Sequence, residues 1–211
     1  MTLPRFYPIL DTATADRFRI DPVVAAEQIV QAGAKILQFR HKSFWSREVF
    51  EMLERVAALC RVSGVLFVVN DRADLARLVG AGVHLGQQDL WPTEVRPMVG
   101  ARTLIGFSTH NQSQLRAAAE EPADYLALGP VFGTATKENP DPVVGVEGLR
   151  RWRPHVPRPL VAIGGITRAN AAEVFAAGAD SVAVIGDLFP EVRARGVEWL
   201  AVAAAATTKA R

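Results

Sequence analysis

Two aspartates follow short apolar runs of the sequence. Asp71 comes after Asn70 at the end of the run 65–69, and Asp89 comes four residues after the run 82–85. If these runs form neighbouring parallel strands, both carboxylates emerge at one edge of the sheet and share either a proton or a cation. Mg²⁺ suits such a pair, because it takes one or two protein carboxylates and completes its shell with water and phosphate oxygens. The pair therefore predicts a Mg²⁺ site; the alternatives are a helix cap at Asp71 and a turn residue at Asp89.

An amide and two cations alternate after another apolar run, in Gln38-Phe39-Arg40-His41-Lys42. A period of two places Gln38, Arg40 and Lys42 on one side of the chain, where they face one anionic ligand. Only four lysines occur in the sequence, and two of them, Lys42 and Lys137, follow apolar runs. The pattern predicts an anion site, and the alternative is a solvated loop whose alternation has no function.

Hydroxyl groups follow two further apolar runs. Ser108 stands after one of them, and a serine with no visible His or Asp partner is expected to donate a hydrogen bond instead of acting as a nucleophile. Thr134, Thr136 and Lys137 follow the next run and form a candidate anion clamp. The segment from there to Gly148 is rich in glycine and proline, which predicts a long active-site loop or lid.

Glycines follow the last two apolar runs, at Gly164-Gly165 and at Gly186 after Ile185. Glycines at such positions let main-chain N–H groups approach a phosphate, which in barrel enzymes commonly binds after the last two strands. They predict a phosphate site, and the alternative is a pair of tight turns. The histidines His84 and His110 are expected to be hydrogen-bonded structural groups.

Eight strands are expected to alternate with helices along the chain, at residues 6–10, 36–39, 65–69, 82–85, 104–107, 125–128, 160–163 and 181–185. Expected helix caps are Asp21, Ser46, Asn111 and Thr167. Strands alternating with helices predict parallel pairing and an α/β fold, a (β/α)8 TIM barrel that spans residues 1–211 as a single domain. The alternative is an open doubly wound sheet, but Asp11-Thr12-Ala13 after the first strand is no phosphate-binding glycine fingerprint.

The composition narrows the class of protein. The 211 residues are 49% hydrophobic and 22% charged, with a net charge of +2, which predicts a large folded core. The single cysteine, Cys60, excludes an internal disulfide and is expected to be buried on a helix face. Scattered arginines speak against a nucleic-acid partner, and no apolar stretch is long enough for a membrane span. A cytoplasmic location is expected, and a homo-oligomer is left open.

Taken in order, these motifs resemble the thiamine phosphate synthase family, also called thiamine-phosphate pyrophosphorylase. The resemblance rests on seven segments between the second and eighth expected strands: Gln38-x-Arg40-x-Lys42, Asn70-Asp71-Arg72, His84-Leu85-Gly86-Gln87-x-Asp89, Gly106-x-Ser108, Gly129-Pro130-Val131-Phe132-x-Thr134-x-Thr136-Lys137, Ala162-Ile163-Gly164-Gly165-Ile166 and Val182-Ala183-Val184-Ile185. The family has the (β/α)8 fold and joins a pyrimidine methyl diphosphate to a thiazole ethyl phosphate, releasing pyrophosphate.

The resemblance implies a role for each matching residue. The pyrimidine diphosphate would be held by Gln38, Arg40, Lys42, Asn70, Ser108 and Lys137, of which Arg40, Lys42, Ser108 and Lys137 would be catalytic. Asp71 and Asp89 would bind Mg²⁺. The thiazole phosphate would be bound by Thr134, Thr136, Gly165, Ile185 and Gly186. The family usually has serine at the position of Gly186, and the first strand of this chain also departs from the family's usual pattern.

Three other functions compete with this one. A thiazole tautomerase uses the same barrel without a metal, but that family lacks the second aspartate and has histidine at the position of Pro130. A non-catalytic phosphate-binding barrel would not need both aspartates and Lys137. Other phosphate-binding barrel isomerases share the glycines after the last two strands but do not account for Asp71 and Asp89.

Overall fold

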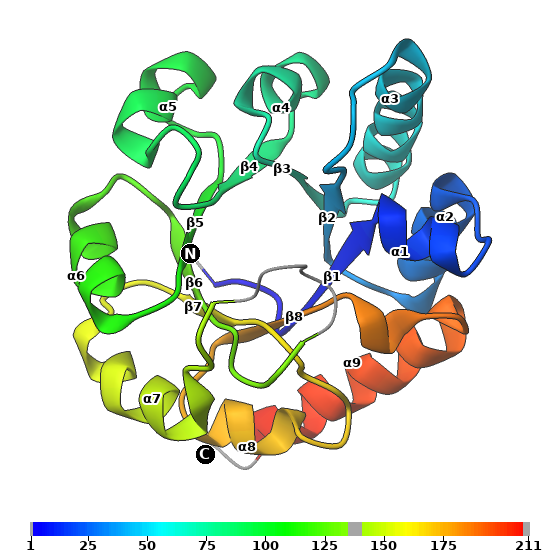
Figure 1. Cartoon of the computed structure of the whole chain (residues 1–211). Coiled ribbons are helices and arrows are strands. Elements are labelled where there is room, and N and C mark those ends of the chain that lie inside the picture. The colour runs from blue at the N-terminus through cyan, green and yellow to red at the C-terminus, as the bar shows by residue number, and fades with distance from the viewer. Residues whose placement is uncertain (1, 135–140, 209–211) are drawn as a thin grey trace.

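The computed structural model describes residues 2–134 and 141–208 of the 211-residue chain. Its strands form one closed barrel in which each strand pairs in parallel with the next and β8 pairs with β1 (Figure 1). The strands are β1 (Phe6–Asp11), β2 (Ile36–Arg40), β3 (Leu66–Asn70), β4 (Gly82–Leu85), β5 (Ile105–Thr109), β6 (Tyr125–Leu128), β7 (Leu160–Ala162) and β8 (Ser181–Val184). The predicted TIM barrel is confirmed, and the open sheet is excluded by the β1–β8 pair.

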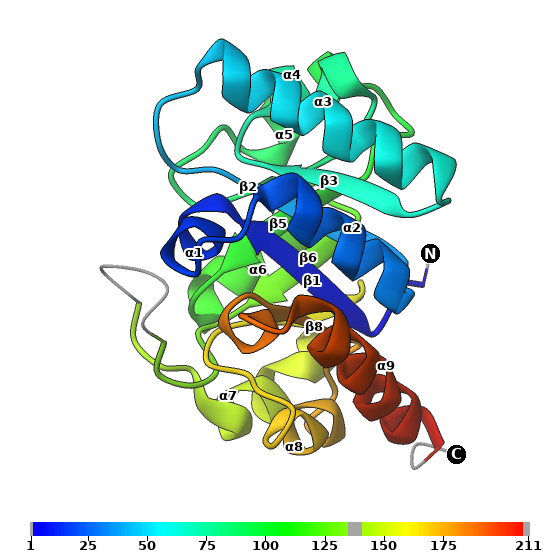
Figure 2. The ribbon, with the colours of Figure 1, turned by 90° about the vertical axis from the view of Figure 1, so that its right-hand side faces the viewer.

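The helices surround the barrel as an outer ring (Figure 1). They are α1 (Thr12–Arg17), α2 (Pro22–Ala32), α3 (Arg47–Val62), α4 (Ala73–Val79), α5 (Pro92–Val99), α6 (Gln112–Glu120), α7 (Gly145–Trp152), α8 (Ala171–Ala176) and α9 (Val192–Thr208), with 3₁₀ turns η1 (Arg153–His155) and η2 (Gly186–Leu188). The ring closes where α9 packs on α2, so closely that a Cβ on Gly196 would lie 2.7 Å from the Cβ of Ala32 (Figure 2).

Three of the four expected helix caps are confirmed. The side chains of Asp21, Ser46 and Asn111 accept main-chain N–H groups at the starts of α2, α3 and α6. The expected cap at Thr167 is wrong. The helix α8 begins after Asn170, whose Oδ1 accepts the Thr167 N–H at 2.7 Å, so Thr167 lies in the turn before the helix.

Alternation along the strands divides the core into two parts. Side chains on one face of the strands fill the barrel, among them Tyr7, Val68 and Tyr125, and those on the other face pack under the helices. At the amino-terminal end, Asp124 accepts the N–H of Ile105 at 2.7 Å and the guanidinium of Arg96 at 2.9 Å, and the same arrangement recurs at Asp180. These carboxylates satisfy main-chain donors at strand starts, which fixes the strands that carry the site.

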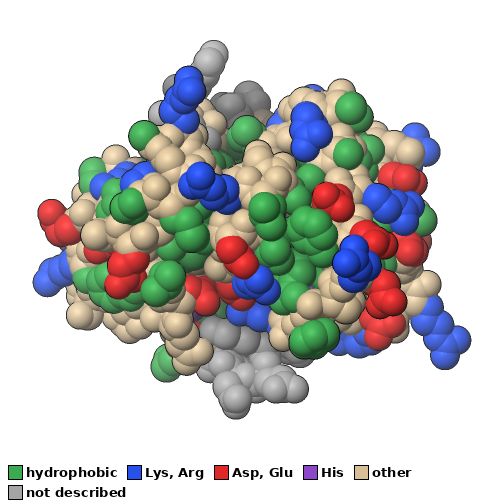
Figure 3. Space-filling model, turned by 90° about the horizontal axis from the view of Figure 1, so that it is seen from above, with side chains coloured by type: hydrophobic (Ala, Val, Ile, Leu, Met, Phe, Trp, Pro, Cys, Tyr) green, Lys and Arg blue, Asp and Glu red, His purple; other side chains and the backbone are tan. Residues whose placement is uncertain are grey.

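The face over α3, α4 and α5 shows basic and acidic side chains interspersed, with hydrophobic side chains between them (Figure 3). No continuous basic face of the kind that binds a phosphate backbone is visible there. Within the described residues, no helix is both long and apolar enough to cross a membrane.

Cys60 lies on the buried face of α3 and is fully buried, as expected. Burial raises the pKa of its thiol to about 12, so the reactive thiolate is scarce at neutral pH. We expect iodoacetamide to leave Cys60 unmodified in the folded protein and to alkylate it fully in urea, as measured by intact mass. Alkylation at the same rate in both conditions would contradict the burial of this helix face.

Candidate active site

Asp71 and Asp89 meet at the carboxyl-terminal ends of β3 and β4. Asp71 follows β3 with a left-handed backbone (φ 64°), and its N–H donates to the carbonyl of His84 on β4 at 2.8 Å. A cavity of about 320 Å³ between these strand ends and α4 and α5 is lined by both aspartates. The structure therefore brings the two carboxyl groups together at one rim of the barrel.

The environment of Asp89 disfavours its charged form. Burial and the neighbouring carboxyl of Asp71 raise the pKa of Asp89, although the N–H of Gly86 donates to its Oδ2 at 2.7 Å and opposes that rise. Two carboxylates held this closely repel each other unless a proton or a cation lies between them. The alternative of a helix cap at Asp71 is wrong, because α4 begins after Arg72 with no side-chain cap. The turn at Asp89 is real and holds the carboxyl in place.

Cations line the rim next to this pair. The ammonium of Lys42 lies 2.6 Å from Oδ2 of Asp71, and the Lys42 side chain is half exposed. Arg40, at the end of β2, forms an ion pair with the buried Asp11 at the end of β1. Asp11 also accepts the N–H and hydroxyl of Thr14, at 2.8 Å and 2.7 Å, which caps α1. The guanidinium of Arg40 is therefore held by a fixed carboxylate.

Two buried amides complete this side of the rim. Gln38 is 2% exposed, and its Nε2 donates to the hydroxyl of Tyr7 at 3.1 Å. Asn70 is 7% exposed, and its Nδ2 has no hydrogen-bond partner among the described residues. An unsatisfied buried donor is costly, and such groups at a functional site are typically satisfied by a ligand.

Ser108 has a histidine partner, which corrects the expectation that it stands alone. Its Oγ lies 2.8 Å from Nε2 of His84, whose Nδ1 lies 3.0 Å from the hydroxyl of Tyr125. Burial lowers the pKa of His84 to about 4, so the imidazole is neutral at neutral pH. His110 is also hydrogen-bonded, through Nδ1 to the carbonyl of Gly129 at 2.7 Å. Both histidines are hydrogen-bonded, as expected.

The glycines after β7 allow two loops to approach each other. Gly164 and Gly165 both have positive φ, of 98° and 63°. A Cβ on Gly164 would lie 2.5 Å from Cα of Pro130, and one on Gly165 would lie 2.4 Å from the carbonyl oxygen of Gly133. These glycines are thus needed by the packing itself, whatever they bind.

The other side of the rim is formed after β6 and β8. Ile185 and Gly186 lie at the start of the turn η2, and Thr134 lies on the loop after β6 near Gly165. Asp187 is engaged in the scaffold, because its Oδ2 accepts from Arg168 and from the indole of Trp199, both at 2.9 Å. Thr136, Lys137 and part of the expected lid lie outside the described residues.

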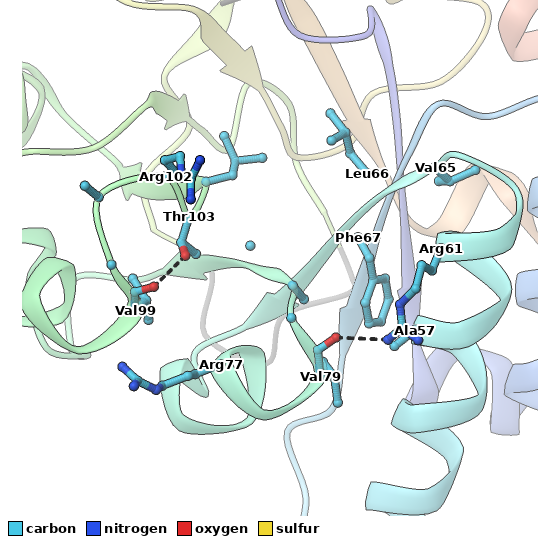
Figure 4. A pocket seen from close by; sticks show the side chains of 16 residues that line it. Ala57, Arg61, Val65, Leu66, Phe67, Arg77, Val79, Val99, Arg102 and Thr103 are labelled. Atoms are coloured by element: carbon cyan, nitrogen blue, oxygen red, sulfur yellow. Dashed lines mark hydrogen bonds between the residues drawn. The ribbon is translucent and has the colours of Figure 1, made fainter.

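A second cavity, of about 740 Å³, lies at the opposite end of the barrel (Figure 4). It is lined by the amino-terminal ends of β3 and β4 and by residues 99–104 before β5. Two of its arginines contact the scaffold: Arg61 donates to the carbonyl of Val79 at 3.5 Å, and Arg77 to that of Met98. Chemistry in TIM barrels takes place at the other end, so this cavity is not the candidate site.

The donor set at the carboxyl-terminal rim fits a hard divalent cation that binds with its substrate. It offers two carboxylates, and no group of three or more acidic, His or Cys side chains suited to a metal occurs among the described residues. An ion held by two carboxylates leaves most of its shell to water and to phosphate oxygens, which is the coordination habit of Mg²⁺. The side chains of Arg40 and Lys42 and the unpartnered Nδ2 of Asn70 suit the phosphate groups of such a substrate.

Comparison with known proteins gives one consistent result. The thiamine monophosphate synthase family matches residues 6–188. The thiamine-phosphate synthase of Koribacter versatilis (strain Ellin345) is 45% identical over 208 residues, covering 96% of this chain and 97% of that protein. The enzyme of Chloroflexus aurantiacus is 43% identical over 182 residues, covering 86% and 83%. A solved structure of thiamine phosphate pyrophosphorylase from Pyrococcus furiosus has a TM-score of 0.84 and 33% identity, covering 96% of each chain. The chain belongs to the thiamine monophosphate synthase family, whose members are transferases.

Proposed function

We propose that this chain transfers the pyrimidinylmethyl group of a pyrimidine methyl diphosphate to the ring nitrogen of a thiazole phosphate, giving thiamine phosphate and pyrophosphate. The observation that carries the proposal is the meeting of Asp71 and Asp89 beside Lys42 at one rim of the barrel. A diphosphate is a poor leaving group unless the negative charge that develops on it is neutralised, and this rim gathers groups that can do so.

The pyrimidine diphosphate is assigned to the side of the rim that carries the cations and amides. Its ligands are Gln38, Arg40, Lys42, Asn70 and Ser108, together with Lys137, which lies outside the described residues. The unpartnered Nδ2 of Asn70 supports this assignment, because the substrate supplies the acceptor that the fold leaves missing.

Mg²⁺ is assigned to Asp71 and Asp89. When bound, it neutralises the negative charge that develops on the departing pyrophosphate. Burial and, after it, the neighbouring carboxyl of Asp71 raise the pKa of Asp89, and a bound cation would offset the repulsion between the two carboxylates.

The thiazole phosphate is assigned to Thr134, Thr136, Gly165, Ile185 and Gly186. The left-handed turn at Gly165 exposes main-chain groups beside the loop after β6, and Gly186 contributes its main-chain N–H where relatives usually have serine. The loss of that one hydroxyl donor leaves the main-chain donors in place.

The main task of the chain's own residues is to stabilise the negative charge that develops on the leaving pyrophosphate. Arg40, Lys42 and Lys137 stabilise the leaving pyrophosphate as the C–O bond of the methylene breaks. The electron-rich aminopyrimidine supports the resulting benzylic-type cation, and the thiazole nitrogen donates its electron pair to form the new C–N bond. Little acid–base chemistry by side chains is needed. With a single, buried cysteine and no need for an oxidising compartment, we assign the reaction to the cytoplasm.

The thiazole tautomerase alternative is disfavoured by two residues. Asp89 is present and lies beside Asp71, and Pro130 stands where the tautomerase has its histidine. A non-catalytic phosphate-binding barrel is disfavoured because binding alone would not require the adjacent carboxylates of Asp71 and Asp89.

The test is pyrophosphate release by the purified chain, followed with a coupled phosphate assay. We expect release only when both substrates and Mg²⁺ are present, and none with either substrate omitted or with excess chelator. Tautomerisation of the thiazole carboxylate without pyrophosphate release would instead establish the alternative. Equal turnover in excess chelator would contradict the metal assignment.

Asp11 is expected to position Arg40 for this reaction. In Asp11→Asn the Oδ1 cap of α1 can persist, but the charge that holds the guanidinium is lost. Hydrogen bonds to charged groups contribute about 1.5–3 kcal/mol, so we expect KM for the pyrimidine diphosphate to rise about tenfold. Thr14→Val is the matched control, since it removes a donor to Asp11 without touching Arg40. Equal effects of the two variants would refute the positioning role.

A further inference from the structure

Five side chains from five strands form a hydrogen-bonded series across the barrel interior. Gln38 Nε2 lies 3.1 Å from the hydroxyl of Tyr7, which lies 2.8 Å from that of Tyr125. The Tyr125 hydroxyl lies 3.0 Å from Nδ1 of His84, and Nε2 of His84 lies 2.8 Å from Oγ of Ser108. The series thus links β2 to β5 through the centre of the molecule.

The protons in this series have one consistent arrangement. The amide nitrogen of Gln38 only donates, so Tyr7 accepts there and gives its own proton to Tyr125. Tyr125 then gives its proton to Nδ1 of His84, which must be unprotonated. The proton of the imidazole is left on Nε2, where it donates to Ser108. With a proton on Nδ1 instead, the buried hydroxyl proton of either Tyr7 or Tyr125 would have no acceptor among the described residues.

We infer that this series runs in one direction, from Gln38 to Ser108, so that it fixes His84 as the Nε2–H tautomer and turns the Ser108 hydroxyl proton outward to the ligand. Ser108 accepts from His84, and its own O–H is left to donate. Tyr125 is then a positioning residue, which acts on the ligand through His84 and Ser108. The consequence for binding rests on the proposed function, in which Ser108 faces a diphosphate.

The opposite direction would give Ser108 a different chemistry. If the amide oxygen of Gln38 faced Tyr7, every proton would reverse, His84 would carry its proton on Nδ1, and Ser108 would donate to Nε2. That is the arrangement of a serine nucleophile activated by a histidine base. Ser108 would then present only lone pairs to the anion, which Lys42 and Arg40 are placed to attract.

The surrounding packing holds the series in place. The ring of Tyr125 stacks on the imidazole of His84 with centroids 5.6 Å apart, and Tyr125 is fully buried. Gly106 on β5 leaves the space for that ring, since a Cβ there would lie 2.0 Å from Cζ of Tyr125. Burial raises the pKa of Tyr7 to about 12 and that of Tyr125 well above its usual value, so both hydroxyls keep their protons.

The first test is the tautomer of His84 in the ligand-free protein, read from long-range ¹H–¹⁵N correlations of the ¹⁵N-histidine-labelled chain at pH 7.5. Comparison with His84→Asn assigns the signals among the four histidines. We expect Nε2 protonated and Nδ1 unprotonated. The Nδ1–H tautomer would reverse the series and overturn the inference, and an imidazolium would overturn it as well.

Two matched variants test the role of Tyr125. In Tyr125→Phe, Nδ1 of His84 loses its donor, and we expect a mixture of both tautomers. In Tyr7→Phe, Tyr125 keeps its hydroxyl and still donates to His84, so the Nε2–H tautomer should persist. An unchanged tautomer in Tyr125→Phe would show that Tyr125 is not the donor and would overturn its positioning role.

Kinetics then connect the series to the ligand. For Tyr125→Phe we expect KM for the pyrimidine diphosphate to rise about three- to tenfold, the effect of one weakened hydrogen bond, with KM for the thiazole phosphate unchanged. An equal rise in both KM values would indicate general damage to the fold and would refute the positioning role. The tautomer is measured without substrate, so this measurement does not depend on the proposed function. A chain that released no pyrophosphate would contradict the proposed function, and the spectrum would still decide the direction of the hydrogen-bonded series.

Discussion

Asp89→Asn lowers the rate of pyrophosphate release by about a hundredfold or more. Removing one group that stabilises charge in the transition state commonly costs a factor of about 10²–10³ in kcat. The asparagine keeps an oxygen that can accept the Gly86 N–H, so the turn is preserved while the negative charge is lost. The measurement is steady-state pyrophosphate release at saturating Mg²⁺ and substrates.

Asp74→Asn is the matched control for that variant. Asp74 lines the same cavity as Asp89, but its carboxylate pairs with Arg72 and is more than half exposed. We expect Asp74→Asn to retain the rate of the unmodified chain. If Asp89→Asn kept the same rate as Asp74→Asn, the carboxylate of Asp89 would not be used in the reaction.

Gly106→Ala destabilises the fold by about 3 kcal/mol, at the upper end of the usual cost of overpacking a core. The new Cβ would lie 2.0 Å from Cζ and 2.5 Å from Cε2 of Tyr125, whose ring is fully buried. Urea unfolding followed by circular dichroism gives the free energy of unfolding for each variant.

A control variant and a double variant test whether the clash with Tyr125 causes this loss of stability. Gly133→Ala adds a Cβ with no atom within 4 Å, so we expect a change within about 0.5 kcal/mol. The double variant Gly106→Ala/Tyr125→Leu should lose less stability than the two single variants added together, because the smaller side chain removes the clash. Full additivity would show that the clash with Tyr125 is not the source of the loss.

The sequence predicts the fold well because its signals are local. Apolar runs of four or five residues alternate with amphipathic stretches, and the structure places strands within one or two residues of each expected range. Asp21 and Ser46 begin helices because their side chains reach N–H groups two or three residues ahead. Thr167 fails as a cap because its N–H donates to Oδ1 of Asn170 in the turn before α8, and the helix begins only after Asn170.

The carboxylate pair is also accessible from sequence, because consecutive strands of a barrel are neighbours and Asp71 and Asp89 follow β3 and β4. The pairings of Ser108 with His84 and of Arg40 with Asp11 cannot be predicted from the sequence, because they depend on the register between strands. In the structure His84 stands opposite Gly106, two residues before Ser108, and Asp11 stands opposite Arg40. The sequence does show a polar residue in each of two neighbouring strands. Which of these side chains meet depends on the register between the strands, and the sequence pattern does not determine that register.

The first strand contributes a supporting group to the rim of the barrel. Asp11, at the end of β1, pairs with Arg40 and caps α1. A pattern of polar residues after a strand does not distinguish such a supporting group from a ligand.

The most direct test of the metal site is equilibrium dialysis of Mn²⁺, used as a substitute for Mg²⁺, in the presence of inorganic pyrophosphate. With both carboxylates intact, we predict about one additional Mn²⁺ per chain on the protein side of the membrane. The double variant Asp71→Asn/Asp89→Asn should retain none. Equal retention of Mn²⁺ by the two proteins would contradict the assignment of the cation to these aspartates.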